Sequence, residues 1–225
     1  MTNFADAGAP QPLEARHKGR KNNPEQTRKD ILQAAIVEFV SLGLSGARVD
    51  AIAERTKTSK RMIYYYFGSK EQLYVEVLEK LYGDIRRTES QLQLAELEPL
   101  QAIQRLVEFT FDHHDRNVDF VRIVGIENIH NGANVKQSPV IRSMSHNVLT
   151  TIKETLLRGE AQGVFRRGVE AIDLHLLISS FCFYRVSNRH TFSEIFQIDL
   201  SEEQIKHRHK AMICESVLHY LQAGI

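Results

Sequence analysis

The stretch Ser59–Lys70 (SKRMIYYYFGSK) places cations, hydroxyl groups and aromatic rings within one short segment. Lys and Arg bind phosphate through their charge, and a tyrosine ring carries a hydroxyl donor out to a DNA backbone. If the stretch is a helix, Ile63 and Phe67 share one face and can anchor it against a neighbouring helix. Such a division is typical of a recognition helix that reads DNA. The other faces of this helix would then present Lys60, Arg61, Tyr64 and Tyr65 to a ligand.

The charge along the chain weighs against a plainer interpretation, in which Tyr64, Tyr65 and Tyr66 only seal a small helical core. Between residues 16 and 70 there are twelve Lys and Arg against five Asp and Glu, a net charge of +7. Residues 71–225 carry a net charge of −4, so the net charge of +1 for the whole chain conceals a basic N-terminal part. The asymmetry favours a polyanionic partner for the first part and a different partner for the second.

This segment is predicted to contain the third of four consecutive helices. Asn23-Pro24-Glu25-Gln26 is a helix start signal, and Gly43 is expected to end the helix that it opens. A second helix is predicted over residues 48–56 and a third over residues 59–67. Ser69-x-x-Gln72 then caps a fourth helix. Helix, short helix, tight turn and short helix within about fifty residues is the layout of a helix-turn-helix.

Residues 48–73 (RVDAIAERTKTSKRMIYYYFGSKEQL) resemble the helix-turn-helix of the TetR (tetracycline repressor) family of transcriptional regulators. The order and spacing of the family's pattern hold across the whole segment. The resemblance implies a DNA-binding domain over residues 23–70. The matching residues are an Ile-Ala pair, a serine that opens the third helix, an aromatic run and a closing Ser-Lys-Glu-x-Leu: Ile52-Ala53, Ser59, Ile63–Phe67 and Ser69–Leu73.

The segment departs from the family's pattern at three places. Thr56-Lys57-Thr58 stands where Ala-Gly-Val is usual, so Lys57 is expected to bear a modest strain where a positive φ is preferred. Arg48 replaces a threonine and loses a cap but adds a cation, and Arg61 replaces a glycine of the third helix. We expect these changes to alter DNA specificity rather than to abolish binding.

Nine residues are predicted to contact DNA, from the motif, the charge and their position. Lys70 is included because the N-terminus of a helix already favours an anion. Residues 1–22 lack helical periodicity and are predicted to be a disordered basic arm. Its segment Arg16–Lys21 (RHKGRK) either lies in a flanking minor groove or forms a solvated tail. The predicted contacts are Lys21, Arg48, Ser59, Lys60, Arg61, Tyr64, Tyr65, Tyr66 and Lys70.

Residues 71–225 are predicted to form a second helical unit, so the whole protein is expected to be all-α. The resemblance implies that this unit binds an effector and forms a homodimer. Its last two long helices, residues 171–188 and 201–221, would pair with their copies in a four-helix interface. Further helices are expected over residues 118–130 and 139–162 and from Pro99 onward.

A pocket for a small-molecule effector is expected among the central helices of this unit. For each aromatic candidate, an ordinary apolar core is the more common explanation. The carboxylate of Glu127, in a segment that is otherwise apolar, needs a partner in the backbone, in a neighbouring helix or in an effector. The candidate walls are Phe109, His113, Phe120, Ile123, Glu127, Phe181, Tyr184, Arg185 and Asn188.

Other chemistry finds little support in the sequence. The histidine groups at residues 113–114 and 207–209 lack the i, i+4 spacing of two metal ligands on one helical face, so we predict neither a metal nor a cofactor. Cys182 and Cys214 lie in apolar helical patterns and are expected to be buried thiols in a reducing compartment. The longest apolar stretch is far short of a membrane span, so we predict a cytoplasmic protein that does not bind a membrane.

The leading hypothesis is a homodimeric transcriptional repressor that a small molecule releases from double-stranded operator DNA. A second hypothesis keeps the DNA contact but replaces the small molecule with a protein partner or with no effector. A third, an enzyme that uses the histidines and Glu127, requires convergent titratable groups in a cleft, which the sequence does not show.

Overall fold

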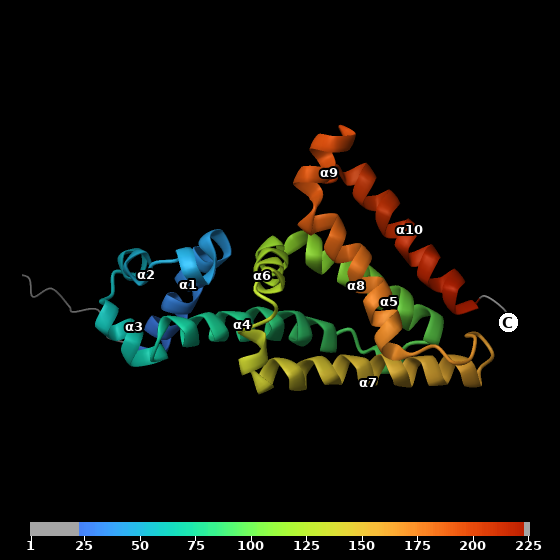
Figure 1. The fold of residues 1–225 in the computed structure, drawn as a ribbon. Helices are drawn as coiled ribbons and strands as arrows, with labels where there is room; N and C mark the ends of the chain where they lie inside the picture. Colours follow the sequence, from blue (N-terminus) through green and yellow to red (C-terminus); the bar gives the residue numbers. More distant parts are fainter. Residues whose placement is uncertain (1–22, 223–225) are drawn as a thin grey trace, which may run out of the picture.

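The computed structural model describes residues 23–222, and in that range the chain forms ten α-helices and two short 3₁₀ helices, with no strand (Figure 1). The all-α prediction is confirmed. The predicted arm, residues 1–22, lies outside the described residues. The α-helices are α1 (Pro24–Gly46), α2 (Val49–Thr56), α3 (Lys60–Phe67), α4 (Lys70–Ser90), α5 (Pro99–Arg116), α6 (Val118–Ile129), α7 (Pro139–Ala161), α8 (Ala171–Ser187), α9 (Arg189–Phe196) and α10 (Glu203–Gln222); the 3₁₀ helices are η1 (Leu94–Glu96) and η2 (Val135–Gln137).

Helix α1 begins where the sequence predicts. The side chain of Asn23 accepts a hydrogen bond from the Gln26 N–H at 3.3 Å, and Pro24 occupies the first turn. The helix is interrupted at Gly43, whose φ of 66° is rare for a residue with a side chain. One further turn follows the interruption and carries the helix to Gly46. The predicted interruption at Gly43 is therefore confirmed, but the helix ends three residues later, at Gly46.

Helices α1, α2 and α3 and the first half of α4 enclose one apolar core. The ring of Phe39 in α1 meets that of Tyr74 in α4 edge to face, with centroids 5.0 Å apart. Ile52 of α2 and Ile63 and Phe67 of α3 are fully buried in the same core. Each such side chain contributes roughly 1.5–3 kcal/mol by leaving water, so packing rather than intrinsic propensity holds the eight-residue α3 in place.

Helix α4 belongs to both domains. Figure 1 shows it extending from the three N-terminal helices into the second domain, where it runs beside α7. Its first half contributes Leu73, Tyr74 and Val77 to the N-terminal core. The helix as a whole contacts α5, α6 and α7, and Tyr82 and Ile85 of its second half pack with Phe120 of α6. One continuous helix therefore packs against both domains.

The second domain has a core of its own, formed by α5, α7, α8 and α10. Leu106 and Phe111 of α5 pack there with Leu174 of α8 and Val217 of α10. Gly159 of α7 lies so close to Phe165 that an added Cβ would come within 1.9 Å of the ring. A glycine is therefore required where the chain turns back from α7.

The C-terminal part differs from the prediction in two respects. A short helix, α9, lies between α8 and α10 and was not predicted. The predicted start of the last helix at residue 201 is wrong: the hydroxyl and the N–H of Ser201 both donate to the Asp199 carboxylate, at 2.6 and 2.7 Å, and α10 begins only at Glu203. None of the helices described between residues 23 and 222 combines the length and hydropathy needed to cross a lipid bilayer.

Candidate functional site

The third helix of the N-terminal domain, α3, is fixed to the core on one side and exposed on the other. The Ser59 hydroxyl accepts a hydrogen bond from the Met62 N–H at 3.3 Å and caps α3. Ile63 and Phe67 point inward and are 1% and 2% exposed. The cap and the two apolar anchors hold α3 in place and leave Arg61, Tyr64 and Tyr65 exposed.

The three consecutive tyrosines have different surroundings. Tyr64 is 45% exposed and Tyr65 is 77% exposed, so both rings can reach a ligand. Tyr66 is half-buried, packs against the N-terminal core and meets the ring of Phe67 edge to face at 6.4 Å. Since successive residues of a helix are about 100° apart, three adjacent rings cannot all face the same way. The structure therefore shows that Tyr66 packs against the core, while its predicted DNA contact stays a prediction.

The N-terminus of α2 is held by a carboxylate that the sequence analysis missed. Glu38 of α1 is buried and accepts a hydrogen bond from the Arg48 N–H at 3.0 Å. The Arg48 side chain is exposed and lies 3.9 Å from Asp50, which also pairs with Lys60 at 2.6 Å. Glu38 thus fixes the backbone at Arg48, and Asp50 links two of the predicted phosphate-binding cations.

Lys70 stands at the first position of α4, beside the cap formed by Ser69. Its ammonium group donates to the Ser45 carbonyl at 3.5 Å, which ties α4 to the last turn of α1. Arg61 is exposed on the first turns of α3. The structure thus brings Arg48, Lys60, Arg61 and Lys70 to one small domain, whereas Lys21 lies outside the described residues.

A cavity of about 290 Å³ opens among α4, α5, α6 and α8 of the second domain; we call it the inner cavity. Phe109 and Phe120, both predicted as pocket walls, line it. Its other walls are aromatic, polar and charged: Tyr82, Arg86, Glu89, Thr110, His114, Asn128, His175, Ser179 and Phe183 are among them. The predicted wall His113 lies between the rings of Phe109 and Phe120, at 5.6 and 5.9 Å, but does not itself line the cavity.

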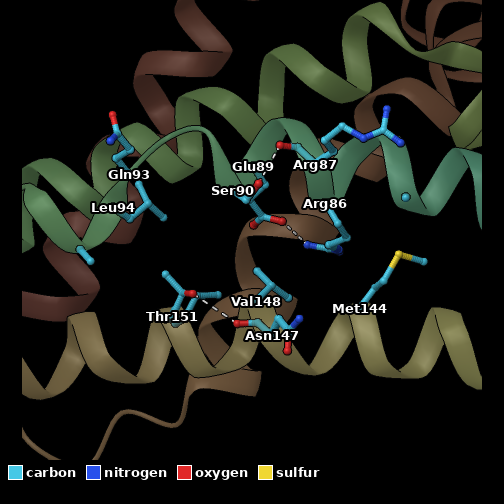
Figure 2. Close-up of a pocket in the computed structure, with 13 residues that line it drawn as sticks. Arg86, Arg87, Glu89, Ser90, Gln93, Leu94, Met144, Asn147, Val148 and Thr151 are labelled. Atoms are coloured by element: carbon cyan, nitrogen blue, oxygen red, sulfur yellow. Dashed lines mark hydrogen bonds and ion pairs between the residues drawn. The ribbon is translucent and has the colours of Figure 1, made fainter.

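A charged pair separates the inner cavity from a second one. Arg86 and Glu89, one turn apart on α4, form a mostly buried ion pair that lines both cavities. The second, of about 560 Å³, lies between α4 and α7, and we call it the outer cavity. Figure 2 shows both side chains directed into it, while Arg87 points away from α7. Nothing in the local sequence pattern distinguished Arg86 from Arg87.

The histidines around the inner cavity are held in their neutral form. Burial, together with the nearby His114 and Arg86, lowers the pKa of His113 to about 4, an effect that Asp84 opposes. Burial, Arg86 and His114 lower the pKa of His175 to about 4 as well. Burial also lowers the pKa of His114, although the hydrogen bond to the Thr110 carbonyl opposes this.

Three predicted pocket walls have structural partners instead. Ile123 is buried in the N-terminal core rather than in a cavity. The carboxylate of Glu127 accepts hydrogen bonds from the Asn134 side chain at 2.8 Å and from the N–H groups of Asn134 and Val135 at 3.1 and 3.2 Å. Arg185 is paired with Asp115 at 2.7 Å and donates to the Leu200 carbonyl at 2.8 Å. These partners lie between 7 and 70 residues away, beyond the reach of a local pattern.

The other three predicted walls lie along the surface of α8. Phe181, Tyr184 and Asn188 line a shallow apolar groove that also includes Ile213 of α10. Tyr184 is 55% exposed, and Leu177, which lines the same groove, is 36% exposed. These three predicted walls therefore lie on an open surface groove and do not line the inner cavity.

Each of the two domains matches a known protein family. Residues 31–77 match the family described as bacterial regulatory proteins, tetR family, and residues 99–217 match the tetracyclin repressor-like C-terminal domain. The chain belongs to the TetR family. This confirms the resemblance inferred from residues 48–73, and it confirms a DNA-binding transcriptional regulator rather than an enzyme.

Relatives and solved structures agree with this assignment. The HTH-type transcriptional repressor NicS of Pseudomonas putida is 37% identical over 187 residues, 83% of this chain and 88% of NicS. The structure of SCO4942 from Streptomyces coelicolor is similar with a TM-score of 0.65 and 23% identity, over 87% of this chain and 98% of that one. FadR of Bacillus subtilis in complex with stearoyl-CoA also gives a TM-score of 0.65, at 17% identity, over 88% of this chain and 99% of that one. The two structures share the TetR fold with this chain.

Proposed function

We propose that this TetR regulator is a homodimeric repressor that a small molecule, bound in the inner cavity, releases from its operator. The observation that carries the proposal is the position of α4. Its N-terminal half packs in the core beneath the recognition helix, and its C-terminal half supplies Tyr82, Arg86 and Glu89 to the cavity wall. One continuous helix therefore connects the two sites. The repressor role is supported by the name of NicS.

Operator contact is assigned to the exposed face of the helix-turn-helix. Arg61, Tyr64 and Tyr65 present donors on α3, where they can meet base edges and phosphates in a major groove. Arg48, Lys60, Ser59 and Lys70 flank them and suit phosphate contact. Tyr66 serves this face by packing behind it. The predicted contact of Lys21 with a minor groove stays part of the proposal.

A second connection between the domains runs through α6. Helix α6 packs on α1, and a Cβ added at Gly43 would lie 3.6 Å from Ile126. Ile123 of α6 is part of the N-terminal core. Because α6 also contributes Phe120 and Val124 to the inner cavity, a ligand that moves α6 moves α1 with it. Such coupling through packed helices requires two arrangements of the domains that bind the operator differently.

The surface of α8 and α10 is assigned to the homodimer. Leu177, Tyr184 and Met212 are exposed there, and exposed apolar side chains gathered on one face mark an interaction surface. A two-fold dimer would place two recognition helices at the half-sites of a palindromic operator. The inner cavity favours a small-molecule effector over the alternative of a protein partner, because a second domain without an effector needs no such space.

Selection of DNA by the purified protein tests this function. A duplex enriched from a random-sequence pool is expected to be palindromic and to bind a dimer. A small-molecule library is then screened for compounds that raise the unfolding temperature, since a ligand that binds only the folded state must stabilise it. At least one of these compounds is expected to lower operator affinity. Enrichment of no sequence, or a stabilising compound bound in the inner cavity that leaves operator affinity unchanged, would overturn the proposal.

A further inference from the structure

The inner cavity has walls suited to a flat ring. Tyr82 and Phe120 meet edge to face at 5.2 Å, with an interplanar angle of 82°, so their faces differ in direction. Phe120 also meets His114 at 5.8 Å, and Phe183 meets the same histidine at 6.4 Å. All four rings line the cavity. Aromatic walls at right angles to one another allow stacking on one face of a ligand and edge contact at its rim.

The charges that line the cavity cancel. Arg86 and Glu89 pair with each other, so together they contribute no net charge. The two histidines of the lining, His114 and His175, have lowered pKa values and are neutral near pH 7. A ligand with a net charge would therefore leave water without gaining an unpaired counter-ion, which is costly in an apolar surrounding.

The cavity also offers one defined hydrogen-bond acceptor. Nδ1 of His114 lies 2.7 Å from the Thr110 carbonyl, and since a carbonyl only accepts, this nitrogen must carry the proton. In the neutral imidazole the other nitrogen, Nε2, is then an acceptor. Its natural partner is an N–H or O–H group of a ligand.

An unused donor lies on the opposite helix. Nε of Arg86 is buried and has no hydrogen-bond partner among residues 23–222, although the guanidinium is already paired with Glu89 through Nη1. A buried donor without a partner costs free energy that an acceptor atom on a ligand would recover.

We propose that the inner cavity binds an uncharged planar ring compound that carries both a hydrogen-bond donor and an acceptor, the donor directed to His114 Nε2 and the acceptor to Arg86. The inference rests on the proposed function, because it names the class of effector for that same cavity. His114 and Arg86 are then the residues that set ligand specificity. An amide attached to an aromatic ring has the required chemistry.

The test compares ring compounds that differ only in their polar group. Dissociation constants of 2-naphthamide, 2-naphthoate, 2-naphthylmethylammonium and naphthalene are measured by calorimetry with the full-length protein at pH 7.5. The amide is expected to bind about tenfold or more tightly than each of the others, which is the effect of one or two hydrogen bonds or of an uncompensated charge. Tighter binding of the carboxylate or the ammonium compound, or no binding of the amide, would overturn the inference.

Variants then assign the preference to the two side chains. His114→Phe removes the acceptor, and the double variant R86M/E89M removes the ion pair without leaving a lone buried charge. Both are expected to reduce the preference for the amide over naphthalene to within about threefold. R87M is the matched control, because Arg87 is the adjacent, exposed residue of α4 and does not line the inner cavity. An amide preference that survives both changes would contradict the assignment.

The outcomes separate this inference from the proposed function. Release of the operator by 2-naphthoate, or by a charged compound from the library screen, would overturn the ligand class and leave ligand-responsive repression intact. If the amide binds in the predicted manner but operator affinity does not change, the ligand class stands and the proposed regulation fails.

Discussion

The two domains of this TetR regulator differ in how many charged side chains they bury. Of the charged residues described between positions 23 and 70, only Glu38 is buried, and it holds the backbone at Arg48. The second domain buries Glu89, Glu127 and Arg185, each with a partner. A surface that meets a polyanion keeps its cations hydrated and exchangeable. The second domain instead keeps charged groups in its interior, where burial requires each one to be paired.

The largest effect on stability is expected at Arg185, where the second domain buries a cation. Arg185→Met breaks the pair with Asp115 and the hydrogen bond to the Leu200 carbonyl, so the free energy of unfolding should fall by about 3 kcal/mol or more. Urea unfolding at a fixed protein concentration measures the loss. Arg116→Met is the control, because Arg116 pairs with another aspartate of α5 but is exposed, and its loss should cost less than about 1 kcal/mol. Equal losses for the two variants would contradict the comparison.

The first domain should respond in binding rather than in stability. Arg61→Ala is expected to weaken operator binding by about 1–3 kcal/mol, roughly 5- to 150-fold, and to change the free energy of unfolding by less than about 0.5 kcal/mol. Fluorescence anisotropy with a labelled duplex over a series of salt concentrations measures both the affinity and its salt dependence. Arg142→Ala on α7 serves as the exposed control in the second domain. A loss of stability without a loss of operator affinity would show that Arg61 supports the fold rather than contacts DNA.

The buried histidines predict how stability depends on pH. His113 and His175 have folded pKa values of about 4, below the ordinary value of 6.5, so between pH 4 and 6.5 the unfolded state binds more protons. Their contribution to stability is therefore fully present above pH 6.5 and declines as the pH falls toward 4. Unfolding temperatures of the wild type between pH 7.5 and 4.5 are expected to show this decline.

A single variant tests the origin of that pH dependence. His113→Asn should make the decline shallower, while His146→Asn, an exposed change on α7, should leave it unaltered. The groups that face His113 and shift its pKa, His114, Arg86 and Asp84, are kept in both variants. The same slope in His113→Asn as in the wild type would show that this histidine is not the source.

The smallest effect concerns the backbone strain at Lys57. The structure confirms the strain that the sequence predicts, since Lys57 ends α2 with a φ of 53°. Lys57→Gly is therefore expected to raise the free energy of unfolding by about 0.5–1 kcal/mol. Gln197→Gly at the end of α9, where φ is 52°, should give a gain of the same size, because this penalty does not depend on the domain. Chemical unfolding of both variants measures the gains, and a loss at either position would contradict the explanation.

The sequence predicted the N-terminal domain well because its signals are local. Ser59 and Ser69 cap the helices that follow them, and Ile63 and Phe67 anchor α3 four residues apart. The division among the tyrosines could not be predicted in full. Which ring packs inward depends on where α1 and α4 lie, and only the folded structure shows that it is Tyr66.

For the second domain the sequence predicted most of the helices but few of the residues that line the inner cavity. Phe109 and Phe120 line the inner cavity, whereas Glu127 and Arg185 are paired within the protein. Arg86 and Glu89 were missed, because an i, i+3 pair of opposite charge on a long helix is usually a solvent-exposed pair. Their burial depends on α7 and α8, which follow far along the chain, and no local pattern reveals it.

The central claim, that one helix connects an effector cavity to an operator-binding surface, is tested most directly by measuring both affinities in both states. The operator dissociation constant is measured with and without a saturating compound from the library screen, and that compound's dissociation constant with and without saturating operator. The account predicts that the two ratios are equal and at least about fivefold, since coupling between sites is reciprocal. Ratios of one for a compound bound in the inner cavity would contradict it.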